Sequence, residues 1–154
     1  EAIINYIRRK HNLLIGERTA EQIKIEIGSA KPYEGETTIE IKGRNQVDGL
    51  PKNVTVTAAE VREALSEPIG NIIEAIRSTL EKTPPELAAD IISSGITLTG
   101  GGAMIDGCAK RLKLDTDMKI FTVPEGAHCV INGLATILEN IDRIPKESYT
   151  VYQG

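Results

Sequence analysis

Ile96-Thr97-Leu98-Thr99-Gly100-Gly101-Gly102-Ala103 is the stretch that decides the fold of this chain of 154 residues. Its first half is apolar and β-branched, as in a buried strand, and it ends in three consecutive glycines. A helix is expected after them, from Met104 to about Leu114. Residues without a Cβ let the backbone approach a ligand closely, so such a turn suits the sugar or phosphate of a nucleotide. A tight turn with close helix packing is the alternative interpretation.

A second segment, Glu17-Arg18-Thr19-Ala20-Glu21-Gln22-Ile23-Lys24, also suits a nucleoside. Glu21 and Lys24 lie one helical turn apart and share a face that excludes Ile23. A carboxylate can accept hydrogen bonds from ribose hydroxyls. A lysine can donate to ribose or base while its methylene stem packs against adenine. The alternative is a surface ion pair worth about 0.3 kcal/mol.

The composition argues against several classes of protein. A net charge of −4 and a pI near 5.3 argue against a nucleic-acid-binding surface. No apolar run reaches the roughly 18 residues that a membrane helix needs. Aromatic residues make up only 3% of the sequence, so the core is expected to be aliphatic. Cys108 and Cys129 have no CxxC spacing; we interpret them as small buried side chains of a cytosolic protein, with a disulfide as the alternative.

Hydrophobic periodicity and capping signals predict the other elements. Helices are expected over 2–12, 20–29, 58–65, 68–80, 86–93 and 127–141, and strands over 37–42, 54–57, 96–99 and 119–123. Thr19 is the expected N-cap of the second helix, and Thr57 with Glu60 forms a capping box for the third. Residues 37–57 are expected to form a hairpin with a long polar loop. The final strand–helix–strand–helix order indicates parallel strands, and hence an α/β or α+β fold.

Six motifs occur in an order and spacing that resemble one known family. They are Gly16 to Lys24, Gly43-Arg44-Asn45, Gly49-Leu50-Pro51, Thr55-Val56-Thr57, Pro84-Pro85-Glu86-Leu87-Ala88 and Leu98 to Ala103. The chain resembles the MreB/Mbl family, the bacterial actin-like, rod-shape-determining proteins, from residue 1 to about 146. The segments 138–142 and 145–146 favour the Mbl-like members of Gram-positive bacteria. The resemblance implies an α/β, actin-like ATPase (ribonuclease H-like) domain II fragment: a partial sheet with flanking helices and a small hairpin subdomain.

The resemblance also implies a domain division and a site. Residues 1–16 and 64–142 would form the larger nucleotide-cleft subdomain, 17–63 the smaller one, and 143–154 a C-terminal tail. The expected ligand is ATP with Mg²⁺. The helix carrying Glu21, Gln22, Ile23 and Lys24 would contact the adenosine. The turn formed by Gly100, Gly101, Gly102 and Ala103 would lie against the nucleoside and the α-phosphate, in agreement with the chemistry of both segments.

The implied function is that of an ATP-binding filament protein that controls rod cell shape. Such a protein is cytoplasmic, polymerises on the inner face of the membrane and organises cell-wall synthesis. Its expected partners are further copies of itself, cell-wall synthesis proteins and membrane-associated morphogenesis proteins, and not nucleic acid. The hairpin at 37–57 is the expected filament contact.

The chain opens with Glu1-Ala2-Ile3-Ile4, an apolar helical pattern without a Met or a capping residue, so we expect a fragment of a longer protein. The family's phosphate loops, catalytic carboxylate and membrane-binding elements would lie before residue 1. The intact parent is expected to be a slow ATPase, and this chain alone is not expected to hydrolyse ATP. We assign no catalytic and no metal-ligating residue.

Two other functions remain open from the sequence: an actin-fold chaperone or sugar-kinase-type ATPase, and a non-nucleotide interaction domain. The remaining polar candidates are interpreted as structural. His11 is expected to be exposed, and His128 to support the last helix near Glu125. Asp115 and Asp117 are expected to be solvated and not to bind a metal.

Overall fold

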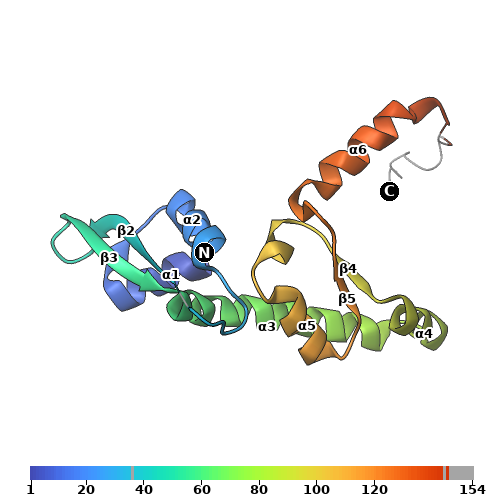
Figure 1. Cartoon of the computed structure of the whole chain (residues 1–154), viewed down its shortest axis with the longest axis horizontal. Helices are drawn as coiled ribbons and strands as arrows, with labels where there is room; N and C mark the ends of the chain where they lie inside the picture. The colour runs from blue at the N-terminus through green and yellow to red at the C-terminus, as the bar shows by residue number, and fades with distance from the viewer. Residues whose placement is uncertain (36, 144, 146–154) are drawn as a thin grey trace.

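A 25-residue helix, α3 (Ala58–Lys82), runs along the length of the molecule, as Figure 1 shows. At 1.5 Å per residue it is about 37 Å long. The computed structural model describes residues 1–35, 37–143 and 145. One end of α3 carries the hairpin half, with α1 (Ala2–His11), α2 (Glu17–Ile27), β1 (Leu13–Leu14), β2 (Thr38–Asn45) and β3 (Pro51–Thr57). The other end carries the parallel half, with α4 (Pro85–Ser94), β4 (Ile96–Leu98), α5 (Cys108–Thr116) and β5 (Ile120–Thr122).

The prediction of two helices over 58–65 and 68–80 is wrong, because α3 continues through Pro68. A proline inside a helix costs about 3 kcal/mol. The apolar stripe of α3 keeps its register across this point, and Leu65, Ile69 and Ile73 are all buried. Burying each such side chain contributes about 1.5–3 kcal/mol, which outweighs the cost of the proline.

The predicted hairpin is confirmed, but its strands are longer and its loop shorter than expected. β2 and β3 pair antiparallel from Thr38↔Thr57 to Arg44↔Pro51. Gly43, placed in the loop by the sequence analysis, lies in β2, where β1 approaches its backbone. A Cβ on Gly43 would lie 2.8 Å from the Cγ of Leu13, so only glycine leaves room for β1. Periodicity does not predict β1, because it has only two residues.

The parallel half contains the expected parallel pair, with Ile96 of β4 opposite Ile120 of β5. The helix predicted from Met104 to about Leu114 is present, but its predicted start is wrong. The glycines lead into a single 3₁₀ turn, η1 (Gly101–Met104), and α5 begins only at Cys108. Gly107, the residue immediately before α5, has a φ of 69°, a left-handed conformation that favours glycine at the start of this helix.

The last helix, α6 (Cys129–Glu139), extends away from both halves and buries none of its residues. It is shorter than the predicted 127–141, because 3₁₀ turns flank it at Gly126–His128 and Ile141–Arg143. Its apolar side chains are 43–70% exposed: Val130, Ile131, Leu134, Ile137 and Leu138. Among the described helices, none has the length and apolar character needed to cross a membrane. Most of the predicted tail, 143–154, lies outside the described residues.

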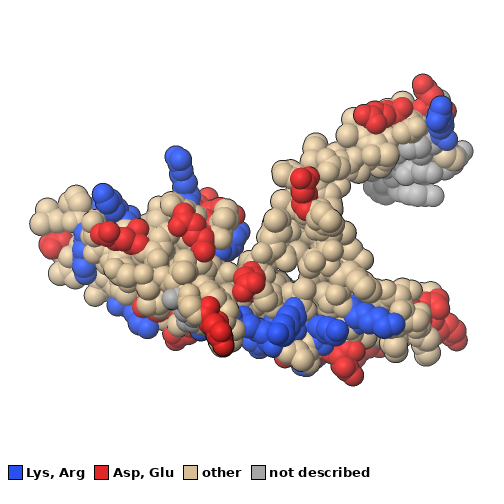
Figure 2. All heavy atoms as spheres, viewed as in Figure 1, with Lys and Arg blue, Asp and Glu red and all other residues tan. Residues whose placement is uncertain are grey.

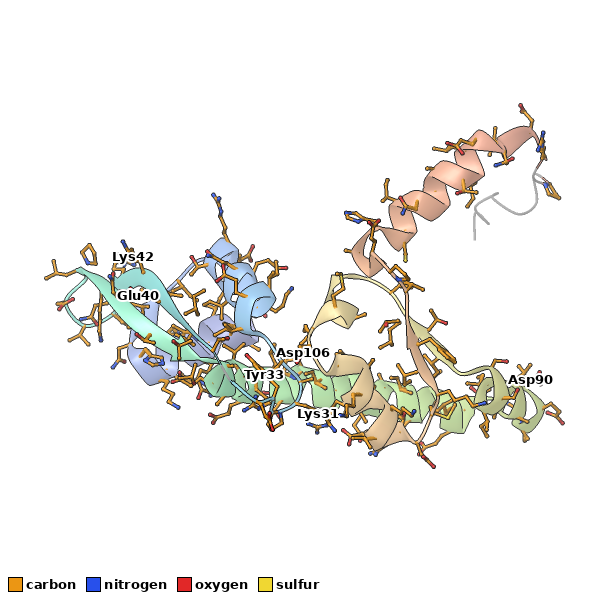
Figure 3. All side chains as sticks on the ribbon, in the orientation of Figure 1. Lys31, Tyr33, Glu40, Lys42, Asp90 and Asp106 are labelled. Carbon is orange, nitrogen blue, oxygen red and sulfur yellow. The ribbon has the colours of Figure 1, made fainter. Side chains whose placement is uncertain are left out.

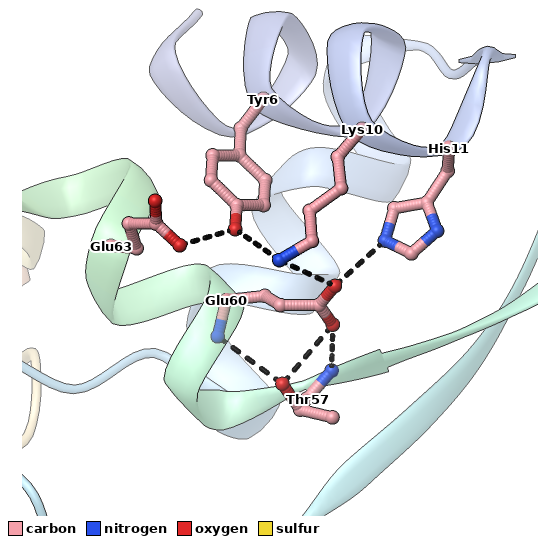
Figure 4. Close-up of polar contacts among 6 residues, drawn as sticks. All are labelled: Tyr6, Lys10, His11, Thr57, Glu60 and Glu63. Carbon is pink, nitrogen blue, oxygen red and sulfur yellow. Dashed lines mark hydrogen bonds and ion pairs between the residues drawn. The ribbon is translucent and has the colours of Figure 1, made fainter.

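A polar cluster ties α1 to the beginning of α3 (Figure 4). The Glu60 carboxylate accepts hydrogen bonds from the backbone N–H of Thr57 at 2.8 Å and from its hydroxyl at 3.1 Å, which confirms the predicted capping box. His11 was expected to be exposed, but its side chain is only 19% exposed and its Nε2 lies 2.9 Å from Glu60 Oε1. Sequence spacing misses this contact, because 49 residues separate the two side chains.

The same cluster contains a second set of contacts. The Tyr6 hydroxyl donates to Glu63 at 2.5 Å and accepts from Lys10 at 3.0 Å. Burial of Tyr6, and then its hydrogen bond to Glu63, raises the pKa of its hydroxyl. Burial by itself also raises the pKa of the Glu60 carboxyl. The hydrogen bonds from Thr57 and the contact with His11 outweigh that effect and hold this pKa below its ordinary value.

We expect Glu60→Gln to lower the free energy of unfolding at pH 7 by about 1 kcal/mol, because the amide weakens the cap and removes the ion pairs. A carboxyl whose pKa is lower in the folded state stabilises the protein above its unfolded pKa. That stability is lost as the pH falls through the folded pKa, so the difference from wild type should close on acidification. Denaturant unfolding between pH 7 and pH 3 measures this.

Glu74→Gln is the matched control, since Glu74 lies on the same helix in an exposed pair with Arg77. It should change the free energy of unfolding by less than about 0.5 kcal/mol. An equal effect of the two substitutions, or a Glu60→Gln effect that does not depend on pH, would contradict the assignment.

Candidate nucleotide site

Helix α2 presents the first predicted group of site residues. It begins at Glu17 after Gly16, so Thr19 lies in its first turn and the predicted Thr19 cap is wrong. Lys24 Nζ lies 2.7 Å from Glu21 Oε2 on the accessible side of the helix, as the i, i+3 spacing predicts. The Gln22 amide donates to Glu26 at 2.8 Å. Ile23 is fully buried in the core, where it supports the helix from behind.

A cavity of about 510 Å³ lies beside the Glu21–Lys24 pair. It is lined by Glu1, Ala2, Ile3 and Ile4 at the start of the chain, by Glu17, Ala20, Glu21 and Lys24 of α2, and by Leu65 and Pro68 of α3. Its walls thus combine aliphatic side chains with the Glu21–Lys24 pair and two further carboxylates, those of Glu1 and Glu17. Apolar surface with a few polar groups is what a flat base with hydrogen-bonding edges requires.

The glycine turn presents the second group of site residues. Gly100 has a φ of 85°, and its N–H donates to the carbonyl of Gly126 at 2.7 Å. Its backbone conformation therefore favours glycine. Gly101 and Gly102 are different: both are exposed, neither has a positive φ, and a Cβ on either would meet no atom within 4 Å. Close packing against the protein does not explain these two glycines.

Ala103 borders a second cavity, of about 480 Å³, which is lined by residues 103–110 and 122–126. The cavity beside α2 and the cavity beside the glycine turn are separate, and neither of these two is lined by both predicted segments. The two segments are nevertheless connected. Ser29, two residues after α2, pairs with Asp106 in an isolated parallel bridge, and the N–H of Ala30 donates to the Asp106 carbonyl at 2.7 Å.

Figure 1 places α2 and the short turn that precedes α5 on the same side of α3. Figure 3 shows Lys31 and Asp106 between the two halves, beside α3. The sequence analysis did not identify Ser29 or Asp106, and a Gly-Ser-Ala segment carries no signal for a bridge to a residue 77 positions away (106 − 29).

The other polar candidates do not form a site. His128 and Glu125 lie 4.0 Å apart, and both side chains are well exposed. Asp115 pairs with Arg111 on its own helix. Within the described part of the chain, no three His, Cys, Asp or Glu side chains are grouped to hold a metal ion. Cys108 is buried, which raises the pKa of its thiol, and Cys129 is half-buried; neither forms a disulfide.

Comparison with known proteins agrees with the predicted fold and family. A family model described as MreB/Mbl protein matches residues 1–146. The cell shape-determining protein Mbl of Bacillus cereus is 47% identical over 146 residues, or 95% of this chain and 44% of the relative. The cell shape-determining protein MreB of Escherichia coli K12 is 45% identical over 142 residues, or 92% of this chain and 41% of the relative. The chain thus spans less than half the length of these relatives.

Solved structures are similar over nearly the whole chain. MreB5 of Spiroplasma citri, solved bound to ADP and to AMPPNP, has a TM-score of 0.86 at 37% identity, covering 92% of this chain and 43% of that one. A MamK double helical filament has a TM-score of 0.70 at 22% identity, covering 94% and 43%, and shows the fold alone. The prediction of a partial actin-like α/β fold is confirmed, and the chain belongs to the MreB/Mbl family.

Proposed function

We propose that this chain supplies part of the ATP site of a filament-forming, cell-shape-determining protein. The observation that carries the proposal is the open space at Gly101 and Gly102, on the same side of α3 as the Glu21–Lys24 pair. Glycines that the protein's own packing does not require suit a backbone that a ligand must approach. The MreB5 relative was solved with ADP and with AMPPNP, which supports a nucleotide as that ligand.

The proposed roles follow from the chemistry of each group. The Glu21 carboxylate accepts from ribose hydroxyls, and Lys24 donates to ribose or base while its stem covers the adenine. The backbone from Gly100 to Ala103 lies against the nucleoside and α-phosphate, with N–H groups available to oxygen. Gln22 lies at the edge of this site, and Ile23 holds α2 in place from the core. The expected Mg²⁺ would accompany the ATP phosphates, whose oxygens it prefers as ligands.

The proposed domain division has residues 1–16 and 64–142 in a larger subdomain and 17–63 in a smaller one. The wider role follows the relatives, which are named for determining cell shape. On this proposal the protein is a slow ATPase of the cytoplasm that forms membrane-associated filaments and organises cell-wall synthesis. Its partners are copies of itself, cell-wall enzymes and membrane-associated morphogenesis proteins.

Gly101→Val is expected to weaken ATP binding by the gene product that contains this chain. The branched side chain fills space that the nucleotide needs, and an overpacking cost of about 1–3 kcal/mol corresponds to roughly a 5- to 150-fold loss of affinity. Calorimetric titration with ATP measures this. The melting temperature should hold steady, because a Cβ at this position meets no protein atom.

Gly100→Ala is the contrasting variant. It should lower stability by about 1 kcal/mol or more, because the backbone at Gly100 is left-handed. Unchanged ATP affinity in a folded Gly101→Val protein would show that the turn is not part of the nucleotide site, and an absence of ATP binding by the wild type would favour the non-nucleotide interaction domain.

Lys24→Ala is expected to weaken ATP binding by roughly fivefold, since one partly exposed contact is worth about 1 kcal/mol. Lys113→Ala, on the exposed side of α5, is the control and should leave the affinity unchanged. The same ATP titration compares the two variants. An equal effect of both would mean that the loss reflects overall charge and not a contact made by Lys24.

The tip of the β2–β3 hairpin is the proposed filament contact. Val47 and Leu50 are 82% and 63% exposed there. Figure 1 shows the end of the β2–β3 hairpin and α4 at opposite ends of the molecule. The turn that presents them is held by its own hydrogen bonds. Asn45 N–H donates to the Leu50 carbonyl at 2.8 Å, and Leu50 N–H donates to the Asp48 side chain at 3.0 Å. A rigid turn with exposed apolar side chains is typical of a protein contact.

Val47→Asp is expected to abolish the ATP-dependent pelleting of the gene product, because a charge would be buried in the contact, while ATP affinity stays the same. Leu114→Asp is the matched control, because Leu114 is also exposed and apolar but lies on α5. Sedimentation in Mg-ATP and without nucleotide tests both. Normal pelleting of Val47→Asp would exclude the hairpin tip, and ATP turnover without any wild-type polymer would favour the chaperone or kinase alternative.

A further inference from the structure

The segment that leaves α2 is fixed by a contact outside the proposed nucleotide site. Ser29 is fully buried and is the one buried polar residue among those described. Its hydroxyl accepts a hydrogen bond from Arg62 Nη1 of α3 at 3.2 Å. The same nitrogen lies 3.5 Å from the carbonyl oxygen of Lys31. One guanidinium group therefore contacts the segment on both sides of Ala30.

The other side of this segment contacts the end of the glycine turn. Ala30 N–H donates to the Asp106 carbonyl at 2.7 Å, and a Cβ on Gly107 would lie 3.2 Å from the Lys31 Cβ. Asp106 and Gly107 are in turn held near α3, because the next helix packs against it through the buried side chains of Cys108 and Leu112. Residues 29–31 are thus enclosed between α3 and residues 106–107.

This connection is short on both sides. Ser29 is five positions after Lys24, and Asp106 is three positions after Ala103. The bridge between Ser29 and Asp106 therefore sets how α2 is oriented toward the glycine turn. A planar guanidinium group with several fixed donors is well suited to hold a serine hydroxyl and a backbone carbonyl at once, which a lysine does less well.

We infer that Arg62 is a positioning residue for nucleotide binding. Through Ser29 and Lys31 it holds the segment that orients the Glu21–Lys24 face toward the Gly100–Ala103 turn. Arg62 is not among the residues that line the cavity beside the Glu21–Lys24 pair, so its proposed effect on the nucleotide is indirect. This inference rests on the proposed function, because the two segments need a fixed separation only if one ligand contacts both.

The test measures ADP affinity by calorimetry, in the gene product that contains this chain, at a temperature where every variant is folded. Arg62→Met is expected to weaken ADP binding by about tenfold, and Ser29→Ala by about threefold. The double variant should bind about as weakly as Arg62→Met alone, because both substitutions remove the same contact. Arg62→Lys should recover part of the loss. Arg77→Met is the control, because Arg77 lies on the same helix but donates to the Asp115 carbonyl.

A merely structural role would lower the melting temperature and leave the ADP affinity of the folded variants unchanged, and that result would overturn the inference. Additive losses in the double variant would also overturn it. If Arg62→Met does not fold, the ADP affinity of Ser29→Ala tests the inference, since this substitution removes only one oxygen atom. If the wild type binds ADP and Arg62→Met binds it equally well, the inference about Arg62 fails while the proposed function stands. If the wild type binds no nucleotide, the proposed function itself fails.

Discussion

Burial of the apolar stripe on α3 is the interaction on which the rest of the structure depends. Val61, Leu65, Ile69 and Ile73 lie on this stripe, and α1, α2, β3 and α5 all contact the helix. Each fully buried aliphatic side chain contributes about 1.5–3 kcal/mol, so four of them exceed the cost of the proline within the same helix. Because elements of both halves pack on one helix, a mainly aliphatic core, with Tyr6 as its buried aromatic residue, holds the described chain together.

The site also depends on this helix. α2 contacts the first half of α3, and α5 holds the far end of the glycine turn against it. The two groups of proposed nucleotide contacts are thus carried by one rigid element. The Ser29–Asp106 bridge then closes the path between them. An affinity for nucleotide would therefore reflect the packing of α3 as much as the residues that touch the ligand.

Sequence reasoning succeeded where the signal is local. The Thr57–Glu60 capping box follows from a spacing of three residues, and the hairpin and the parallel order of β4 and β5 follow from the order of neighbouring elements along the chain. It failed where distant contacts decide. Pro68 predicted the start of a helix, because the burial of apolar side chains on both sides of Pro68 cannot be predicted from the neighbouring residues alone. The sequence predicts an exposed His11, because its contact with Glu60 forms only in the folded protein. It predicts Gly43 in a loop, because β1 lies against Gly43 only in the folded protein.

The candidate site divides in the same way. The Glu21–Lys24 pair follows from helical spacing, and the glycine turn from its sequence. The contacts of Ser29 with Arg62 and Asp106 could not be predicted, since serine in a short connection is ordinary and its burial depends on three segments meeting. The open space at Gly101 and Gly102 is likewise visible only in the folded structure. This space favours a role in ligand binding over a role in close packing for the two glycines.

The uncovered face of α6 has a consequence for the lifetime of the protein in a cell. Its exposed aliphatic side chains form a ridge along a helix whose one charged residue is Glu139, and Figure 2 shows the acidic and basic side chains of this arm mainly toward its tip. Chaperones and proteases continuously sort chains that expose apolar surface. Abundance of the protein should therefore follow how completely this ridge is covered by further chain or by a partner. A well-packed core around α3 does not by itself protect the chain from degradation.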